Sequence, residues 1–395
     1  MPRAALRWVA IGVFLFSSAL NYLDRSLLAA AAPALKAEFH LSNQDYGGIV
    51  SVFSVMYAVF SPLAGWFIDL IGLNAGATIA VLVWSVAGAS TGLARSVRGV
   101  FASRTALGIA EAAGIPCFGK ANGIYLEARE LALGTACNQI GISLGLTAAP
   151  LIVAWIAPHY GWRATFVLCG ALGLIWVPLW LYTAKKIPAQ PEKTKKSTLP
   201  IRDILRDPRL WGLVISTLFM MSLYTLWTNW TTLYYVEHWH LTQREANARY
   251  AWIPPLFGTF GGFAGGWMAF RWIKNGLEVI AARMRCCWIF GIAALIATAA
   301  IPLMPGVLWA TAAVSISAFW ALGATSNLYA LPIDLFGPGR AALGVSALTS
   351  AYGLMQAPMS VAIGAIVDRA GFHVVFLSVA ALPLIGVVIL WRVIR

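Results

Sequence analysis

Long apolar segments of about twenty residues, separated by short polar stretches, are the feature that most limits how this chain can fold. A helical segment of about 20 apolar residues spans the hydrocarbon layer of a bilayer. In that layer no water satisfies backbone N–H and C=O groups, so a chain must form helices or a closed barrel. Barrel strands alternate polar and apolar residues over about 10 positions, whereas these runs are uninterrupted and rich in Ala, Leu, Gly and Trp. The sequence therefore predicts an all-α membrane protein.

Twelve such segments can be placed along the 395 residues, which are 60% hydrophobic and only 11% charged. A soluble chain carries roughly 25% charged residues, so most of this chain is expected to lie in lipid. The predicted spans are Trp8–Ala32, Tyr46–Ile68, Leu73–Leu93, Arg98–Lys120, Leu131–Ile156, Trp162–Thr183, Leu210–Tyr235, Tyr250–Trp272, Met284–Met304, Val307–Leu331, Ala341–Val367 and His373–Ile394.

A basic polar segment divides the spans into two sets of six. We predict an N-terminal half over residues 1–183, a cytoplasmic linker over 184–209 and a C-terminal half over 210–395. The halves echo each other at an offset of about 200 residues: Gly65-Trp66 precedes Gly266-Trp267, and Gly161-Trp162 precedes Gly371-Phe372. Six spans per half predict a parallel repeat about the membrane normal, with a binding site near the midplane between halves.

The net charge of +13 is mainly a topology signal. Of 28 Lys and Arg, 19 fall in the terminal segments, the even-numbered loops and the span ends beside them, 7 lie at the odd-numbered loops, and 2 lie inside spans. Basic loops stay cytoplasmic, so both termini and the linker are expected there, in a bacterial-type inner membrane. A nucleic-acid partner is not expected.

Cysteines and glycines are expected to serve helix packing. The five cysteines fall in or at the ends of apolar spans without metal-ligand spacing, so we expect neither a disulfide framework nor a metal or other cofactor. Glycines of the eighth span allow close helix approach; they are Gly258, Gly261, Gly262, Gly265 and Gly266. We expect a monomer.

Four charged residues lie well inside the predicted spans: Asp24, Arg25, Arg104 and Glu111. An ionisable residue within the membrane costs at least about 2.5 kcal/mol and is functional by default. Arg104 and Glu111 are seven residues apart and share a helix face. Counted at 1.5 Å per residue from the outer span ends, Arg25 and Arg104 lie at depths of about 12 and about 9 Å. The two carboxyl groups and two guanidinium groups are therefore expected to pair across helices.

This charge set has two interpretations. A buried ion-pair network could only fix helix packing, although apolar replacement of such networks is often neutral. Alternatively, an anion could bind Arg25 or Arg104 and displace a carboxylate, which then accepts a proton. Proton and anion binding then favour one another reciprocally, as in a proton–anion symporter with Asp24 and Glu111 as couplers.

Other polar side chains in the spans could complete a substrate site, or could serve as helix–helix hydrogen bonds or interfacial aromatics. The candidates are Tyr57, Asn138, Gln139, Tyr224, Trp227, Asn229, Asn327, Tyr352 and Gln356.

Two motifs contain the four charged residues: Asn21-Tyr22-Leu23-Asp24-Arg25, and Arg104 to Gly108 followed by Glu111-Ala112. These motifs resemble the anion:cation symporters of the major facilitator superfamily, which include sugar-acid and hexuronate permeases, sialic acid exporters and vesicular glutamate transporters. The resemblance implies protonatable Asp24 and Glu111, gating or substrate-binding Arg25 and Arg104, and a substrate-contacting Tyr57. The matching residues are Asn21-Tyr22-Leu23-Asp24-Arg25, Ala31-Ala32-Pro33, Arg104 to Gly108, Glu111-Ala112, Pro116, Lys120, Ala149-Pro150, Gly161-Trp162-Arg163, Phe166, Gly265-Gly266-Trp267, Ile273, Gly276 and Arg283.

The chain departs from this family at three places. Asn74 stands near a usual basic residue, Phe270 replaces a usual Asp, and the seventh span has no arginine. The last departure argues against a dicarboxylate that would need a second cation. We expect proton-coupled symport of a small organic anion, a monocarboxylate such as a sugar acid, by alternating access. The alternatives are an efflux carrier or facilitator of the same fold; an enzyme would need a nucleophile, a metal or a catalytic dyad, and the sequence offers none.

The topology prediction is testable by thiol labelling. A cysteine introduced at Ser197, in the basic linker, should stay unlabelled when intact cells meet a membrane-impermeant thiol reagent, and should react once the membrane is permeabilised. Labelling of Ser197→Cys in intact cells would invert the predicted orientation.

Overall fold

The computed structural model describes residues 3–127, 130–187 and 205–394, and almost all of these residues are helical. The first helices are α1 (Arg3–Phe39), α2 (Asn43–Ile71), α3 (Leu73–Leu93), α4 (Val97–Glu111), α5 (Gly114–Tyr125) and α6 (Leu131–Lys186). They are followed by α8 (Pro208–Met220), α9 (Ser222–Asn229), α10 (Thr231–Leu233), η1 (Tyr234–His238), α11 (Gln243–Glu245), η2 (Ala246–Ala251), α12 (Ile253–Lys274), α13 (Val279–Ala300), η3 (Ile301–Leu303), α14 (Val307–Phe336), α15 (Pro338–Ala380) and α16 (Leu382–Ile394).

All twelve predicted spans lie mainly on helical residues, which confirms the all-α fold class. Within the described ranges, eight helices are apolar and long enough to cross a membrane by length and composition alone. The two longest helices, α6 with 56 residues and α15 with 43, each turn at a glycine with positive φ, at Gly161 (φ 78°) and Gly371 (φ 77°). A left-handed backbone favours glycine, so the repeated Gly-aromatic pair of the sequence makes the same turn twice. The number of twelve crossings stays a prediction.

The described residues form two compact units. Unit 1 takes its residues from Met1–Leu41, Ile49–Lys195 and Gln243–Ala248, and unit 2 from Ser42–Gly48, Lys196–Thr242 and Arg249–Arg395. Each unit therefore contains a short segment from the opposite half of the sequence. The predicted division of the chain at 184–209 stays a prediction, and residues 188–204 of that linker lie outside the described ranges.

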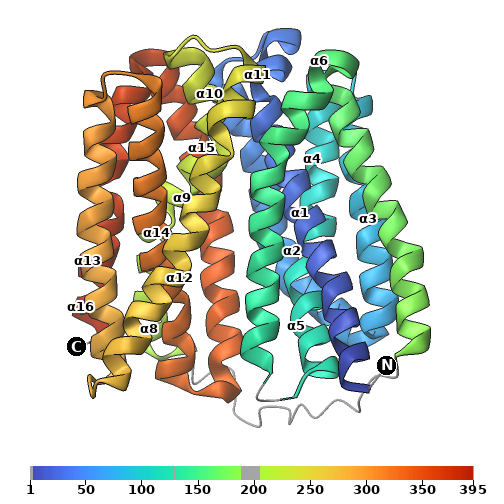
Figure 1. Cartoon of the computed structure of the whole chain (residues 1–395), viewed down its shortest axis with the longest axis vertical. Coiled ribbons are helices and arrows are strands. Elements are labelled where there is room, and N and C mark those ends of the chain that lie inside the picture. Colours follow the sequence, from blue (N-terminus) through green and yellow to red (C-terminus); the bar gives the residue numbers. More distant parts are fainter. Residues whose placement is uncertain (1–2, 128–129, 188–204, 395) are drawn as a thin grey trace. The chain divides into compact units, whose positions relative to one another are not determined.

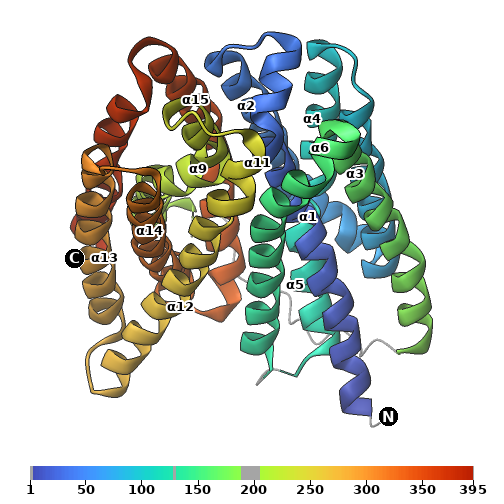
Figure 2. The same cartoon turned by 45° about the horizontal axis from the view of Figure 1, so that its top comes forward.

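In unit 1, α1 packs along α6, and α3 packs against α6 and α4 (Figures 1 and 2). An aromatic cluster fills the bundle beside α1, where Phe14 lies edge-on to Trp176 and Trp180. The indole N–H of Trp176 donates to the backbone carbonyl of Val13 at 2.7 Å, which satisfies its polar atom in the core.

The Gly161-Trp162-Arg163 sequence forms the turn within α6 and contacts the ends of two neighbouring helices in unit 1. Arg163 pairs with Glu38 at 2.6 Å and donates to the carbonyl of Ala94 at 2.9 Å, while Trp162 Nε1 donates to the same carboxylate at 2.9 Å. The ends of α1 and α3 are thereby fixed beside α6.

The predicted fourth span is two helices rather than one, because α4 ends at Glu111 and α5 begins at Gly114. Pro116 has no N–H to donate to the carbonyl of Ala112, and its ring crowds that carbonyl. The sequence signal for this break was present in Pro116, and the break places Glu111 at a helix end.

In unit 2, α12 packs against α14 through glycines, as the sequence predicts. A Cβ atom at Gly261 would overlap the backbone of Phe319, and one at Gly265 would overlap the backbone of Gly323. Gly266, on another face of α12, has open space around it. Dispersion contacts between close backbones replace the hydrophobic effect inside a bilayer.

These glycines give a matched stability test. Gly261→Ala should lower the free energy of unfolding of the purified protein by about 1–3 kcal/mol, as overpacking does. Gly266→Ala should be neutral or slightly stabilising, because alanine is the better helix former. Thermal unfolding of both variants in detergent checks the difference; equal melting temperatures would contradict close packing at Gly261.

Candidate functional site

The four charged residues singled out in the sequence come together inside unit 1. Arg25 of α1 donates through Nε to Oε2 of Glu111, at the end of α4, over 2.7 Å. Arg104, also of α4, donates to the backbone carbonyl of Asp24 at 3.4 Å and interacts electrostatically with both carboxyl groups. One of the expected pairs across helices, that of Arg25 with Glu111, is therefore present, whereas Arg104 contacts the backbone of Asp24.

The charged cluster lies largely in the interior of unit 1, and the Arg25 side chain is its most exposed member at 17%. Glu111 is 0% exposed, and Asp24 and Arg104 are each 2% exposed. Several polar atoms have no hydrogen-bond partner within the described part of the chain: Oε1 of Glu111, Oδ1 of Asp24 and Nη2 of Arg25. A buried polar atom without a partner costs about 1–3 kcal/mol, so these atoms offer sites for a ligand or water.

Aromatic rings surround the Arg25 guanidinium group. Its Cζ atom lies 4.2 Å from the ring centre of Tyr57, 4.8 Å from that of Tyr22 and 5.2 Å from that of Phe53. Phe53 also lies 5.0 Å from Cζ of Arg104. The negative faces of such rings stabilise a cation, and the buried hydroxyl of Tyr57 has no partner among the described residues. The rings and Glu111 therefore fix the position of the Arg25 guanidinium group, while its Nη2 atom has no hydrogen-bond partner among the described residues.

The Asp24 carboxyl group has its own surroundings. A Cβ atom on Gly88 of α3 would lie 2.9 Å from Asp24 Oδ1, so glycine at this position leaves space for the carboxyl group. Cys169 of α6 interacts electrostatically with the Asp24 carboxyl group. Sequence reasoning treated this cysteine only as a packing residue, since nothing in its spacing indicates a contact with α1.

The remaining unit 1 candidates lie on α6. The Ser18 hydroxyl of α1 donates to Oδ1 of Asn138 at 2.7 Å, which makes Asn138 a helix–helix contact. Gln139 is exposed on the surface of unit 1. Sequence reasoning did not single out Tyr22 and Phe53, although Phe53 precedes Tyr57 by one helical turn and shares its face.

The unit 2 candidates lie on three helices, α9, α14 and α15. The rings of Tyr224 and Tyr352 lie edge to face at 5.7 Å. Trp227 is buried and donates to Ser317 at 3.0 Å, and Asn229 donates to the carbonyl of Thr225 at 2.9 Å. Gln356 is buried on α15.

Asn327 lies elsewhere in unit 2. Its amide donates to Gly323 and accepts from Arg283, which pairs with Asp334 at 2.9 Å. These contacts occupy both ends of the Asn327 amide within unit 2.

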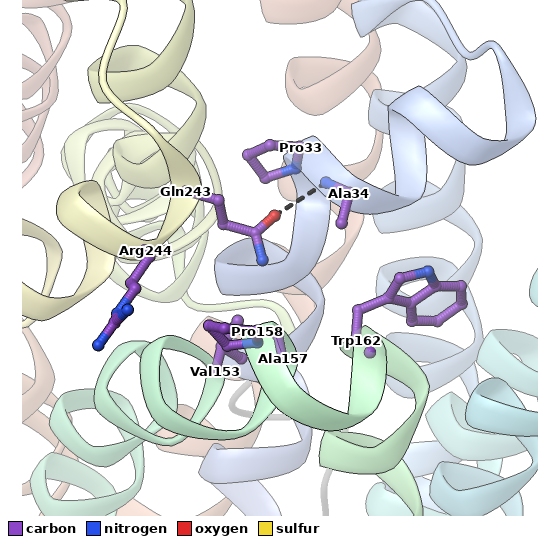
Figure 3. Close-up of a pocket in the computed structure, with 9 residues that line it drawn as sticks. Pro33, Ala34, Val153, Ala157, Pro158, Trp162, Gln243 and Arg244 are labelled. Atoms are coloured by element: carbon purple, nitrogen blue, oxygen red, sulfur yellow. Dashed lines mark hydrogen bonds between the residues drawn. The ribbon is translucent and has the colours of Figure 1, made fainter.

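A separate pocket of about 430 Å³ lies in unit 1 beside the end of α1 (Figure 3). None of the predicted site residues lines it. Its walls are mostly apolar, with Gln243 and Arg244 as the polar members; the lining residues are Pro33, Ala34, Val153, Ala157, Pro158, Gly161, Trp162, Gln243 and Arg244.

Comparison with known proteins places the chain in a family. It is 28% identical over 411 residues to the hexuronate transporter of Escherichia coli K12, covering 99% of this chain and 94% of that protein. It is 31% identical to the galacturonate transporter of Dickeya chrysanthemi, over 67% of this chain and 81% of the relative.

Among solved structures, a bacterial homologue of the human lysosomal transporter Spinster, in an inward-facing and unoccupied conformation, matches with a TM-score of 0.78 and 18% identity. The match covers 98% of this chain and 95% of that one, and it shows the fold alone. The Major Facilitator Superfamily model matches residues 14–360, which confirms the family resemblance read from the sequence motifs. The chain is therefore an integral membrane protein that belongs to the Major Facilitator Superfamily.

Proposed function

We propose that this protein is a proton-coupled symporter for a small organic anion, a monocarboxylate of the sugar-acid class, working by alternating access. The observation that carries the proposal is the buried Arg25–Glu111 pair, in which the cation keeps an unused donor and the acid an unused acceptor. The relatives named as hexuronate and galacturonate transporters support the sugar-acid class.

The first step of the mechanism is exchange of partners at Arg25. A substrate carboxylate binds the unused Nη2 atom and competes with Glu111 for the guanidinium group. Arginine suits this role because its planar group presents parallel donors to a carboxylate. The aromatic rings of Tyr22, Phe53 and Tyr57 hold the guanidinium group while its acidic partner changes.

The second step is proton uptake. A buried carboxylate that has lost its cation is poorly solvated and becomes neutral by accepting a proton. Glu111 is the first acceptor, since it pairs directly with Arg25. Asp24 of α1 lies against α3 and α6 and is the second candidate coupler. Arg104 interacts electrostatically with its carboxyl group.

Sugar hydroxyl groups need neutral hydrogen-bonding partners. In unit 1 these are Tyr57, Asn138 and Gln139. In unit 2 we assign the role to Tyr224, Asn229, Tyr352 and Gln356, and to Trp227 and Asn327 in exchange for their bonds to Ser317 and Arg283. A single carboxylate in the substrate fits the absence of arginine from residues 210–235.

The cellular setting follows from the charge distribution. We place the protein in a bacterial inner membrane as a monomer, with both termini and residues 184–209 in the cytoplasm. Residues 1–183 and 210–395 form the two repeat halves, as the paired Gly-aromatic turns support.

Uptake into proteoliposomes tests the function. The parent protein should accumulate D-galacturonate or D-glucuronate when the outside is acidified. Glu111→Gln should lose at least about 90% of this accumulation yet retain exchange of labelled for unlabelled substrate, because an amide mimics a protonated carboxyl group. Glu38→Gln, which removes the exposed partner of Arg163, is the control and should accumulate as the parent does.

Two results would contradict this proposal. A folded parent protein that takes up neither sugar acid is not a transporter of this class. A Glu111→Gln variant that concentrates substrate as well as the parent is evidence that this carboxyl group does not couple proton movement.

Lysine substitution separates anion binding from helix packing. Arg25→Lys and Arg104→Lys should reach the membrane but lose most uptake, since an ammonium group cannot replace a planar bidentate donor. Arg163→Lys is the matched control and should keep most activity. If packing were the only role, the doubly neutral variant Arg25→Gln with Glu111→Gln would leave no unpaired charge and would restore uptake. Rescue by that double variant would place the anion elsewhere.

A further inference from the structure

Two short segments of the chain pack in the unit that consists mainly of the opposite sequence half. Residues 42–48, which begin α2, belong to unit 2, and residues 243–248, which include α11, belong to unit 1. We name them the first strap (42–48) and the second strap (243–248).

The second strap binds α1 at a proline. Pro33 lies inside α1, where its ring removes one backbone donor and disturbs the preceding turn. The N–H of Ala34 donates to Oε1 of Gln243 at 2.9 Å, as Figure 3 shows. Nδ2 of Asn247 donates to the carbonyl of Ala30 at 2.8 Å, in a fully buried position. The strap thus contacts both polar ends of the backbone turn from Ala30 to Ala34.

The first strap binds a similar helix interruption in unit 2. Helix α9 ends at Asn229 and α10 begins at Thr231, so regular helix is interrupted at Trp230. The Tyr46 hydroxyl donates to the carbonyl of Asn229 at 2.8 Å, and the Tyr46 ring lies edge-on to Trp230 at 5.1 Å. Here too, a strap side chain satisfies a helix carbonyl at an interruption.

The two contacts correspond in the sequence repeat. Tyr46 and Asn247, the donors, are 201 positions apart, and Ala30 and Asn229, the acceptors, are 199 positions apart. Both values are close to the offset of 201 residues between Gly65-Trp66 and Gly266-Trp267. Different side chains therefore make the same contact in the two halves.

Each strap follows directly the helix that the other strap holds. Helix α1 ends at Phe39, just before the first strap, and η1 ends at His238, just before the second strap. Further contacts fix the first strap: the Asp368 carboxylate accepts from the N–H groups of Asn43 at 3.0 Å and Gln44 at 2.9 Å. A strap that leaves its binding position therefore moves the helix that precedes it in the chain. That helix is the one whose interrupted turn the other strap binds.

We propose that the two straps stabilise the interrupted turns of α1 and α9–α10, and that both straps leave these turns together in the transport cycle. Ala30 is five residues from Arg25, about 7.5 Å along the helix, so release loosens the turn next to the anion site. The proposal rests on the proposed transport function, and Tyr46, Gln243 and Asn247 act in it as positioning residues.

Hydrogen exchange of the purified full-length protein, measured without ligand, tests joint release. Tyr46→Phe and Asn247→Leu each remove one donor, and Gln243→Met is a third variant should Asn247→Leu fail to fold. Each should speed amide exchange roughly fivefold in both residues 26–39 and residues 224–236, as loss of one hydrogen bond permits. Trp176→Phe, which removes another donor to a carbonyl of α1, is the control and should leave residues 224–236 unchanged.

The other outcomes overturn the proposal. Faster exchange only in the segment that the altered strap binds would show two independent local contacts. Unchanged exchange in both segments would show that the straps hold neither turn, and a rise that includes α13 would show general loosening.

A second arm separates this proposal from the proposed function. D-galacturonate added to the parent protein should change exchange in both segments in the same direction. A response in one segment only contradicts joint release. No response in either segment counts against the sugar-acid substrate, and the ligand-free comparison of variants still decides the role of the straps.

Discussion

The absence of water around the backbone is the constraint on which this structure depends. Every N–H and C=O group within the bilayer needs an internal partner, so helices continue wherever they can, and each interruption must be compensated. Several interruptions have visible causes: Pro33 in α1, Pro116 after α4, and the turns at Gly161 and Gly371. Another interruption lies at Trp230, between α9 and α10. Two interruptions are satisfied by side chains from distant sequence, and one lies at the buried acid Glu111.

The same constraint explains why the charged site is informative. Ions in a dry interior are expensive unless paired, and Arg25 is paired with Glu111 while aromatic rings cover its faces. The arrangement leaves polar atoms of both partners unused. A purely structural pair would gain by satisfying those atoms, whereas a site that must accept and release an anion has to keep them available. Under the proposed transport function, these unpaired atoms of Arg25 and Glu111 are the ones that would bind the substrate and the proton.

Much of this could be predicted from the sequence, because membrane helices give strong signals. The apolar runs gave the helices, and the charge census found Asp24, Arg25, Arg104 and Glu111, since such residues are rare inside spans. The contacts of Cys169 and Gly88 with Asp24 could not be predicted, because they depend on how α3 and α6 rotate against α1. The straps were also missed: Tyr46 and Asn247 differ chemically, so their correspondence is visible only once both hydrogen bonds are known.

The break between α4 and α5 has a consequence for the electric field at Glu111. A helix carries partial negative charge at its C-terminus and partial positive charge at its N-terminus, and the field is strong only within the last turn. In an unbroken helix these charges would lie far away at the membrane surfaces. Here Glu111 ends α4, and α5 begins three residues later at Gly114, so opposite helix ends meet beside one carboxyl group. The backbone conformation of the two residues between α4 and α5 determines which helix end the carboxyl group faces. This conformation therefore influences the charge that the position tolerates.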